Sequence, residues 1–433
     1  MWNKIVQAFK IKDLRNRILF TILLLLMIRI LSHIPIPGID VDKLQLFFTR
    51  SKGLGLLDIF SGGAMKNFSI AMMGVGPYIN ASIIMQLLTH VVPSLEALQK
   101  EGEDGRKKIN QWTRWISVPL AFLQSYGMIM LLRSQGQGLV GDLGIGQFLS
   151  VILITATGTV LLMWLGELIT EKGIGNGISL IIALGIIAGM PSIVQSLWVA
   201  NQGTGVSGII SIAGLIILSI IVIVSIIYTN EGNRLIPVSY ARRVQGNRLY
   251  GGGDTQLPLK LNTAGVIPII FALSFMIFPN MISQFLSNAR TPWLAHAAKW
   301  VGSTFSISPP TIWYTLLYFV LVVAFTFFYT SVIFNPKEIS ENIQKQGGFV
   351  PGIRPGNETS KYLGFIILRL TFSGALFLGI IAVLPNIVDL IKSGHQSVDT
   401  LIGGTSILII VSVILETYRQ LQAQMIMRSY EDY

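Results

Sequence analysis

Ten long apolar segments constrain what this chain can fold into more than any other feature of its sequence. They fall near residues 17–36, 73–92, 113–133, 147–169, 177–197, 206–229, 264–287, 312–334, 362–387 and 402–421. Each is about as long as the roughly 20 residues that an α-helix needs to cross a lipid bilayer. Because the bilayer core offers no water to unpaired peptide groups, such segments are expected to be helical. The sequence therefore predicts an all-α integral membrane protein with ten transmembrane helices.

The overall composition agrees with a membrane protein. Hydrophobic residues make up 52% of the chain and charged residues 12%, whereas charged residues are roughly a quarter of an ordinary soluble domain. The first apolar segment carries Arg29 and is followed by further spans rather than by a cleavage site, so we expect a retained helix and not a signal peptide. The chain has no cysteine, which excludes disulfides and thiolate metal sites.

Positive charges are distributed unequally between the two sets of loops. Most lysines and arginines lie in the N-terminal segment and in the loops near 100–114, 230–262 and 335–361. The opposite loops hold only Lys43, Arg50, Lys52, Lys66, Arg133, Arg290, Lys299 and Lys392. Because cytoplasmic loops carry an excess of Lys and Arg, we expect both termini in the cytoplasm.

The chain offers few groups for catalysis or for ion transport. Its four histidines are scattered, and no GxxxxGK[ST] phosphate-binding loop occurs. Arg29 and Arg369 lie inside spans, but no paired Asp/Glu relay accompanies them. Isolated charges of this kind mostly anchor helices by reaching the interface. We expect no enzymatic activity, no catalytic residue, no cofactor, no metal ion and no small-molecule substrate.

Two short motifs recur in the second part of the chain. GVGPYI at 74–79 returns as GVIPII at 265–270, and NGISLII at 176–182 returns as GGTSILI at 403–409. Each pair opens spans that are five helices apart and therefore antiparallel. Chance similarity in a biased composition is the alternative for either pair alone. Together they predict two inverted-repeat halves, residues 1–200 with helices one to five and residues 201–433 with helices six to ten, and a functional pathway between them.

The recurring motifs carry branched apolar side chains that would converge on a central axis if the two halves face each other. These residues are Val75, Ile79, Ile178, Ile182, Ile270 and Ile409. A ring of such side chains would narrow a water-filled pore and hinder ions by dewetting. Ordinary core or lipid-facing positions are the alternative for any one of them.

A further apolar segment, residues 53–72, lies between the first and second spans and is too short to cross the membrane. Its apolar centre contains Leu57, Ile59 and Phe60, and Gly62 and Gly63 interrupt it. This pattern is typical of a re-entrant or plug-like element that could close a pore from outside. An interfacial amphipathic helix is the alternative.

Two cytoplasmic loops, 230–262 and 335–361, are rich in glycine and proline, so we expect tight turns that present their side chains. Their prominent arginines are Arg242, Arg243, Arg248 and Arg354. Such charges commonly set topology or meet anionic lipid. The sharper hypothesis is a docking face for a polyanion or an acidic protein.

Five motifs resemble the SecY family, whose bacterial members are channel subunits of the Sec translocon. They are MMGVGPYINASIIMQLL, EKGIGNGISLII, LPLKLNTAGVIPIIFA, QKQGGFVPGIRPGNETSKYL and GGTSILII, and they occur in this order over nearly the whole chain. The resemblance implies a passive channel of ten helices in the bacterial plasma membrane. It would pass unfolded secretory polypeptides across the membrane and release apolar segments into lipid through a lateral gate.

The resemblance also implies roles for individual residues. The six branched residues match the family's pore ring, and segment 53–72 matches its plug. Gln86, Gln124 and Asn262 match polar positions of the lateral gate. Arg354 matches the arginine on which the SecA motor ATPase depends, and the other loop arginines match residues that face the ribosome or the motor. Val75 stands where isoleucine is often found, and Asn247 stands where a basic residue is often found.

The partners that the resemblance implies are the small membrane subunits SecE and SecG, the SecA motor, the ribosome, signal-sequence-bearing polypeptides and membrane lipid. A secondary transporter with inverted repeats is the alternative function, and it would need convergent polar groups at the membrane midplane. The sequence places isoleucines there instead. A purely structural membrane scaffold is a third option, against which the long basic loops weigh.

Overall fold

Helices dominate the computed structural model, which describes residues 9–37, 44, 61, 63–134, 144–201, 206–240, 243–245, 248–250, 254–286, 291–305, 311–391 and 404–431. Each of the ten predicted spans coincides with a helix. These are α2 (Lys12–Leu31), α5 (Gly76–Val91), α7 (Glu103–Ser134), α8 (Ile145–Lys172), α9 (Gly177–Asn201), α10 (Val206–Glu231), α11 (Ile267–Leu286), α13 (Ile312–Ile333), α15 (Asn357–Ile391) and α16 (Gly404–Glu431).

Length and apolarity alone qualify five of the described helices as membrane-spanning. A sixth span results when α5 is joined to α6 (Pro93–Lys100) across a bend of 100°. Shorter apolar stretches occupy Gly177–Ser192 of α9 and Ile267–Met276 of α11. The described helices are therefore consistent with the predicted ten-span architecture.

Exposed tryptophans mark the two membrane interfaces. Trp112 and Trp115 are exposed near the start of α7. At the other end of the bundle, Trp198 of α9, Trp300 of α12 (Pro292–Thr304) and Trp313 of α13 are exposed as well. Because tryptophan concentrates at the level of the lipid headgroups, these two belts indicate that the bundle stands across the bilayer.

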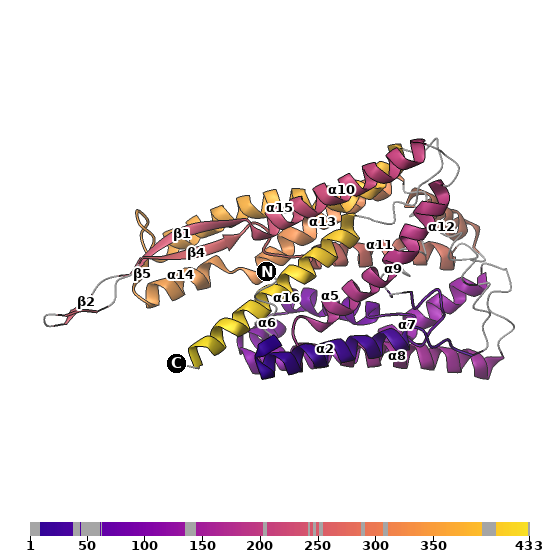
Figure 1. Ribbon diagram of the computed structural model, residues 1–433, viewed down its shortest axis with the longest axis horizontal. Helices are drawn as coiled ribbons and strands as arrows, with labels where there is room; N and C mark the ends of the chain where they lie inside the picture. Colours follow the sequence, from indigo (N-terminus) through magenta and orange to yellow (C-terminus); the bar gives the residue numbers. More distant parts are fainter. Residues whose placement is uncertain are drawn as a thin grey trace.

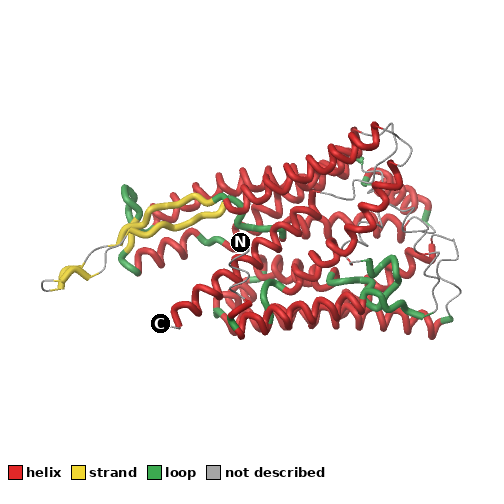
Figure 2. The backbone as a smooth tube through the Cα atoms, viewed as in Figure 1, coloured by secondary structure: helices red, strands yellow, loops and turns green. Residues whose placement is uncertain are grey.

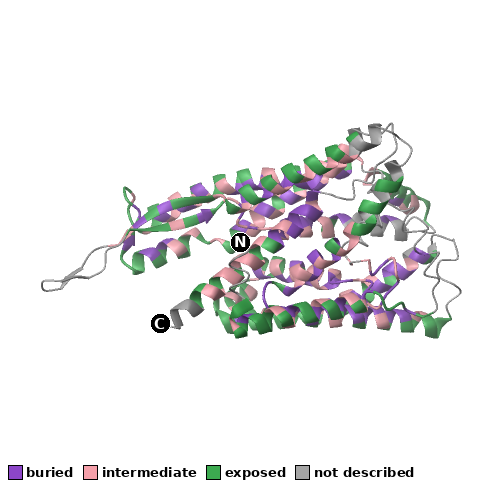
Figure 3. Cartoon of the chain, in the orientation of Figure 1, coloured by how far each residue is buried: buried purple, intermediate pink, exposed green. Residues whose placement is uncertain are grey.

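The helices pack as two groups that meet along a seam (Figure 1). In one group α5 packs on α7, α7 on α8, and α8 on α2 and α9; in the other α11 and α15 pack on α13, and α10 and α15 on α16. The groups meet where α5 and α7 contact α11 and where α9 contacts α16. Buried residues follow the interior of both groups, and exposed residues cover the outer helices (Figure 3).

Small residues let neighbouring helices approach closely, as is common in membranes. A Cβ on Gly177, at the start of α9, would lie only 1.8 Å from the carbonyl oxygen of Gly166 on α8. The chain between α8 and α9 turns through Gly175, whose φ of +89° suits glycine. The junction of these two helices is therefore tightly constrained near the motif that carries Ile178 and Ile182.

A small sheet lies at one end of the molecule, where it projects from the helix bundle together with α14 (Pro336–Lys345) and the start of α15 (Figure 2). It has the order β4–β1–β5 and consists of β1 (Asn233–Tyr240), β4 (Asp254–Lys260) and β5 (Gly348–Phe349), all paired antiparallel. The strands β2 (Arg243–Gln245) and β3 (Arg248–Tyr250) form a separate hairpin. The sequence analysis expected only turns here, so the sheet is an addition to the all-α prediction.

Packing explains why this sheet forms. Ile236 and Val238 are buried on one face of β1, and they contact a cluster that contains Ile343 of α14 (Pro336–Lys345) and Leu363 of α15. Asn335 caps α14, since its side-chain oxygen accepts hydrogen bonds from the backbone N–H groups of the two residues after Pro336. The sheet and α14 thus cover the projecting start of α15 and form one folded extension.

We predict that Gly158→Val lowers the free energy of unfolding by about 1–3 kcal/mol, as overpacking usually does. Gly158 lies on α8, and a Cβ there would lie 2.0 Å from the carbonyl oxygen of Ile70. Thermal unfolding in detergent measures the effect. The control is Gly214→Ala in α10, where an added Cβ meets nothing within 4 Å and helix propensity rises. Equal stability of the two variants would contradict the close contact.

Candidate functional site

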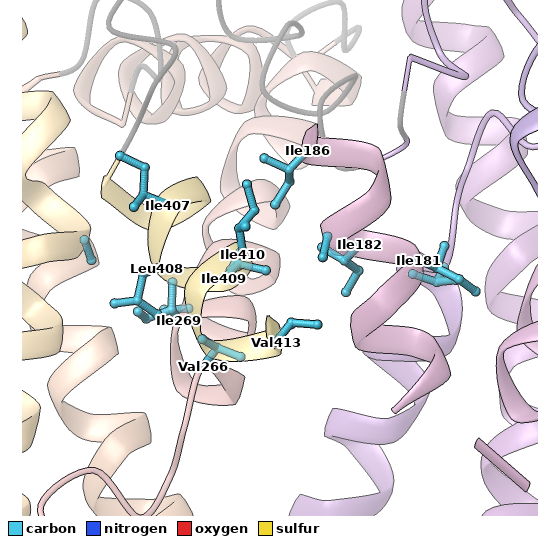
Figure 4. Packing of buried hydrophobic residues seen from close by; sticks show 14 of the residues in the cluster. Ile181, Ile182, Ile186, Val266, Ile269, Ile407, Leu408, Ile409, Ile410 and Val413 are labelled. Carbon is cyan, nitrogen blue, oxygen red and sulfur yellow. The ribbon is translucent and has the colours of Figure 1, made fainter. Parts of the chain in front are cut away.

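The six residues of the predicted ring all belong to one contiguous apolar cluster at the seam. Val75, Ile182 and Ile409 are almost completely buried, with exposed fractions of 2%, 3% and 0%. Ile79, Ile178 and Ile270 are partly buried and pack against the same cluster. In Figure 4, Ile182 lies on the side of α9 that faces α16 and Ile409, and Ile181 lies toward α8. None of the six is in the exposed class of residues.

Ile178 has a second neighbour that the sequence did not indicate. Its terminal methyl group would lie 2.7 Å from a Cβ on Gly166. Ile178 is thus packed into the gap between α9 and α8, whereas Ile182, one turn later, faces the seam. Of the two, Ile182 is the better placed to close a central pore.

Several further residues of this cluster were missed by the sequence analysis. Val266 and Ile269 near the start of α11, and Leu408 and Val413 on α16, are all at most 5% exposed. Figure 4 shows them around Ile409. A signal for Val266 was available, because it occupies the place of Val75 when GVIPII is aligned with GVGPYI. The interior of the seam is therefore filled by branched side chains from both helix groups.

The predicted plug is only partly covered by the described residues. Leu57, Ile59, Phe60 and Gly62 lie outside them. Ser61 accepts a hydrogen bond from the backbone N–H of Met65 at 3.1 Å, and Gly63 has a φ of +80° that glycine tolerates. Residues 64–68 and 70–75 form turns and no helix. Ser61 also lines a small cavity together with Arg29 of α2 and Ile181 of α9.

The second part of this segment is fixed to the chain that follows α2. The N–H of Ile36 donates to the carbonyl of Phe68 at 2.9 Å, and the N–H of Ile70 donates to the carbonyl of Ile34 at 3.1 Å. Phe68 is fully buried at a φ of +45°, which is rare for a bulky residue and requires firm support from its surroundings. This part of the segment is therefore anchored inside the protein.

The three polar residues predicted for a gate make their described contacts within their own helix groups. Gln124 of α7 faces α5, because its Oε1 lies 4.0 Å from the Cβ position of Gly76. Gln86 of α5 donates to the hydroxyl of Ser82 at 3.3 Å, and its Oε1 is buried with no hydrogen-bond partner in the described part of the chain. Asn262 lies just before α11.

The hydrogen bonds of Asn262 point away from α5 and α7. Its Nδ2 donates to Oδ1 of Asn230 at 2.9 Å, and its Oδ1 accepts from the N–H of Gly265 at 3.0 Å. Asn230 lies at the end of α10, in the same helix group as α11. Asn262 is 8% exposed, so these bonds satisfy a buried amide.

An aromatic contact joins the two helix groups directly. The rings of His90 on α5 and Phe328 on α13 meet edge to face, with centroids 5.5 Å apart. On the α13 side, Phe271 of α11 contacts Phe325 and Tyr329 in the same geometry. The seam is therefore lined by aromatic side chains as well as by isoleucines, which no motif had indicated.

The predicted docking arginines are covered unequally. Arg242 lies outside the described residues, and Arg243 and Arg248 lie in β2 and β3, where only the backbone is described. Arg354 is exposed in the turn between β5 and α15. Its carbonyl accepts a hydrogen bond from the Thr359 hydroxyl at 2.9 Å, and Gly356 follows it with a φ of +96°. The turn is thus firmly shaped and presents the Arg354 side chain to solvent.

An ion pair joins α7 to α8. Nε of Arg114 on α7 lies 2.7 Å from a carboxylate oxygen of Glu167 on α8. No motif in the sequence indicated that these two residues form a pair. Within the described ranges, no group of three or more histidines and carboxylates could hold a metal ion.

Comparisons of the sequence find close relatives over the whole chain. The SecY family model matches residues 69–418. A protein translocase subunit SecY from Streptomyces galbus is 41% identical over 446 residues, which cover 100% of both chains. The protein of the same name from Corynebacterium glutamicum is 43% identical over 442 residues, covering 99% of this chain and 98% of the relative.

Comparisons of the fold find solved channel structures. A structure described as a protein-conducting channel has a TM-score of 0.60 and 19% identity, and the match covers 94% of this chain and 91% of that one. A structure concerned with the plug domain of SecY has a TM-score of 0.63 and 22% identity at the same coverage. Sec61 from the canine ribosome-channel complex has a TM-score of 0.59 and 20% identity, again at the same coverage. These similarities are to the fold.

We predict that Ile182→Ser raises ion leakage through the protein in planar bilayers by about tenfold. Replacing one buried isoleucine with a polar side chain removes on the order of 1.5–3 kcal/mol of apolar burial and favours wetting of the seam. The matched control is Ile187→Ser on the same helix, because Ile187 is 46% exposed. Equal leakage in the two variants would argue against a seal at Ile182.

Proposed function

The chain belongs to the SecY family, and from this premise we propose how its seam, plug and extension serve a protein-conducting channel. Relatives of about the same length that are 41–43% identical to it are protein translocase subunits. The channel passes unfolded secretory polypeptides across the membrane and releases apolar segments sideways. The observation that carries this function is the closed cluster of branched side chains from two helix groups.

The rival function, a secondary transporter, is not favoured by the chemistry of the seam. A transport site needs convergent polar or charged groups near the membrane midplane. The seam instead holds Val75, Ile182, Ile409 and their aliphatic neighbours. A polypeptide that crosses the membrane exposes side chains of every kind. It passes most easily through a pore that binds none of these side chains firmly. Apolar side chains also resist ions by dewetting when the pore is empty.

In the resting channel, we infer that the pore ring and the plug act in series. Of the predicted ring residues, Val75, Ile79, Ile182, Ile270 and Ile409 form the narrow waist, and Ile178 supports it from the gap between α9 and α8. The segment at 53–72, with Leu57, Ile59, Phe60, Gly62 and Gly63, covers the waist from outside. The anchored chain around Phe68 would remain in place while the preceding part of the segment moves aside, because two backbone hydrogen bonds hold it to the residues after α2.

The lateral gate would open where α5 and α7 meet α11 and α13. Apolar residues gain roughly 0.3–0.6 kcal/mol each on insertion at the helix centre, whereas Asp, Lys or Arg costs about 2.5–3.5 kcal/mol. An open seam would therefore sort segments by partitioning into lipid. The contact between His90 and Phe328 crosses between α5 and α13, and we propose Gln86, Gln124 and Asn262 as the polar residues of this gate. Opening would separate the aromatic pair.

Opening requires the two helix groups to move relative to each other. We propose that residues 1–200 and 201–433 form the two halves, as the inverted motifs predict. Complete reversal of a resting preference for the closed state, from 1:99 to 99:1, needs about 5.5 kcal/mol of differential binding. A signal sequence in the gate and a partner on the cytoplasmic extension would supply this together.

The cytoplasmic extension would dock the partners that drive transport. Arg354 is exposed on a shaped turn, and the hairpin with Arg243 and Arg248 lies farthest from the helices (Figure 1). We propose SecA or the ribosome as the docked partner, with Arg242 in the same face. A Sec61 structure similar in fold comes from a ribosome-channel complex. SecE and SecG would accompany the channel in the bacterial plasma membrane, with both termini in the cytoplasm.

We predict that a stalled secretory chain crosslinks to cysteines that replace Ile79, Ile182, Ile270 and Ile409. All four positions belong to the waist cluster, and the native chain has no cysteine to give a background. Thiol crosslinking followed by electrophoresis measures the contacts. A cysteine at Ile187, which is 46% exposed on α9, is the control and should not react with the stalled chain. Crosslinks at Ile187 alone would exclude the proposed path.

We predict that Arg354→Glu reduces motor-driven export by about tenfold, because losing one charge contact at an interface costs at least 1.4 kcal/mol in many complexes. Export of a signal-bearing polypeptide into proteoliposomes with SecA and ATP is the measurement. Arg234→Glu, an equal change of charge at an exposed position of β1, is the control. Similar losses in both variants would point to general electrostatics rather than to a contact at Arg354.

A further inference from the structure

Asn230, near the end of α10, makes hydrogen bonds to two other segments through its side chain. Its Oδ1 accepts from Nδ2 of Asn262 at 2.9 Å, and its Nδ2 donates to the hydroxyl of Ser412 at 2.9 Å. Its backbone carbonyl also accepts from Arg419 at 2.9 Å. No motif in the sequence singled out Asn230, and the function proposed above gives it no role.

The two side-chain partners of Asn230 lie close in the sequence to the waist residues Ile270 and Ile409. Asn262 begins the short turn that enters α11, the helix of Ile270, and this turn is held by the bond from Gly265 to Asn262. Ser412 follows Ile409 by less than one turn of α16. One amide therefore ties together the segments that carry both ring residues of the second helix group.

Burial makes these bonds consequential. Asn262 and Ser412 are only 8% and 9% exposed. A buried amide or hydroxyl that loses its partner is strongly disfavoured unless it can reach water or a new partner. Nδ2 of Asn262 also donates to the carbonyl of Gly265, at the longer distance of 3.3 Å. Without the amide of Asn230, Asn262 would keep only these bonds within its own turn, and the start of α11 would lose this tie to α10 and α16.

The neighbouring ion pair is a weaker candidate for this role. Arg419 lies 2.8 Å from a carboxylate oxygen of Glu231, but the two side chains are 33% and 52% exposed. Water and salt screen such a pair, which usually contributes little. The bonds of Arg419 to Glu231 and to the carbonyl of Asn230 join α16 to α10. The link to α11 runs through Asn230 and Asn262.

We propose that Asn230 is a positioning residue of the channel. It sets the spacing of α11 and α16, and with it the position of Ile270 relative to Ile409, so that the waist and the gate remain closed until a signal sequence binds. This inference rests on the proposed function of a polypeptide channel. It also gives Asn262 a specific role at rest, as the link between the gate helix and the rear of its own helix group.

The dependence of export on a signal sequence distinguishes a positioning role of Asn230 from a purely stabilising role. The same polypeptide is offered to proteoliposomes with SecA and ATP, once with and once without its signal sequence. We expect Asn230→Leu to raise the ratio of signal-less to signal-bearing export by roughly threefold to tenfold, the range by which one buried hydrogen bond shifts an equilibrium. Asn230→Asp should stay near the wild-type ratio, because a carboxylate accepts from both Asn262 and Ser412.

Thr229→Val is the matched control. Thr229 is the preceding residue, is 5% exposed, and bonds only within α10, to the carbonyl of Ser225 at 2.9 Å. The ratio of signal-less to signal-bearing export in Thr229→Val should remain that of the wild type. The double variant Asn230→Leu with Asn262→Leu should raise the ratio by less than the product of the two single increases, because both substitutions break the bond between Asn230 and Asn262.

An unchanged ratio in Asn230→Leu, with both substrates exported less, would overturn the proposal and leave only a stabilising role. If Asn230→Leu does not accumulate in the membrane, Ser412→Ala tests the proposal instead, because it removes only the bond from Asn230 to α16. A raised export ratio in Ser412→Ala supports the proposal, and an unchanged ratio overturns it. Failure of the proposed function would give a different result from failure of the proposal for Asn230. In that case, the wild-type protein would not export the signal-bearing polypeptide at all.

Discussion

The packing of branched aliphatic side chains at the seam is the interaction on which the rest of the structure depends. Val75, Ile182 and Ile409 come from three separate segments, and each is nearly excluded from solvent. Aliphatic contacts have no preferred direction and can reform around a different surface. The same side chains can therefore pack against one another in a closed pore and against a polypeptide in an open one. A waist of hydrogen-bonded polar groups would leave partners unsatisfied whenever it opened.

Directional interactions surround this adaptable centre. The backbone bonds at Ile36 and Ile70 fix the chain beside the plug, and the Asn230 amide joins the starting turn of α11 to α16. Close approach at Gly166 and Gly177 fixes α9 against α8. These directional contacts lie within each helix group, whereas the aliphatic cluster and the ring contact between His90 and Phe328 join the two groups. This division favours movement along the seam over deformation within either group.

The sequence predicted the features that depend on local pattern. Apolar length located ten helices, and the echo of GVGPYI in GVIPII identified positions that meet in one cluster. It missed features that depend on partners far along the chain. Asn262 was matched to a gate, but nothing in the sequence named Asn230 as its partner, and Arg114 and Glu167 were not paired. The sheet around Ile236 and Val238 was obscured because a short alternating strand lies among glycine-rich turns.

Asn262 and Gln86 differ in whether the polar atoms of their side chains are hydrogen-bonded. Asn262 is satisfied within its own helix group, whereas Gln86 on the facing helix has a buried oxygen without a partner in the described part of the chain. An unsatisfied acceptor is disfavoured in the closed seam and gains water or a polar peptide group when the seam opens. In the proposed channel, Gln86 would therefore lower the free energy difference between the closed and open states, whereas the bond between Asn230 and Asn262 would raise it. The resting balance of the proposed gate would follow from these opposing contributions.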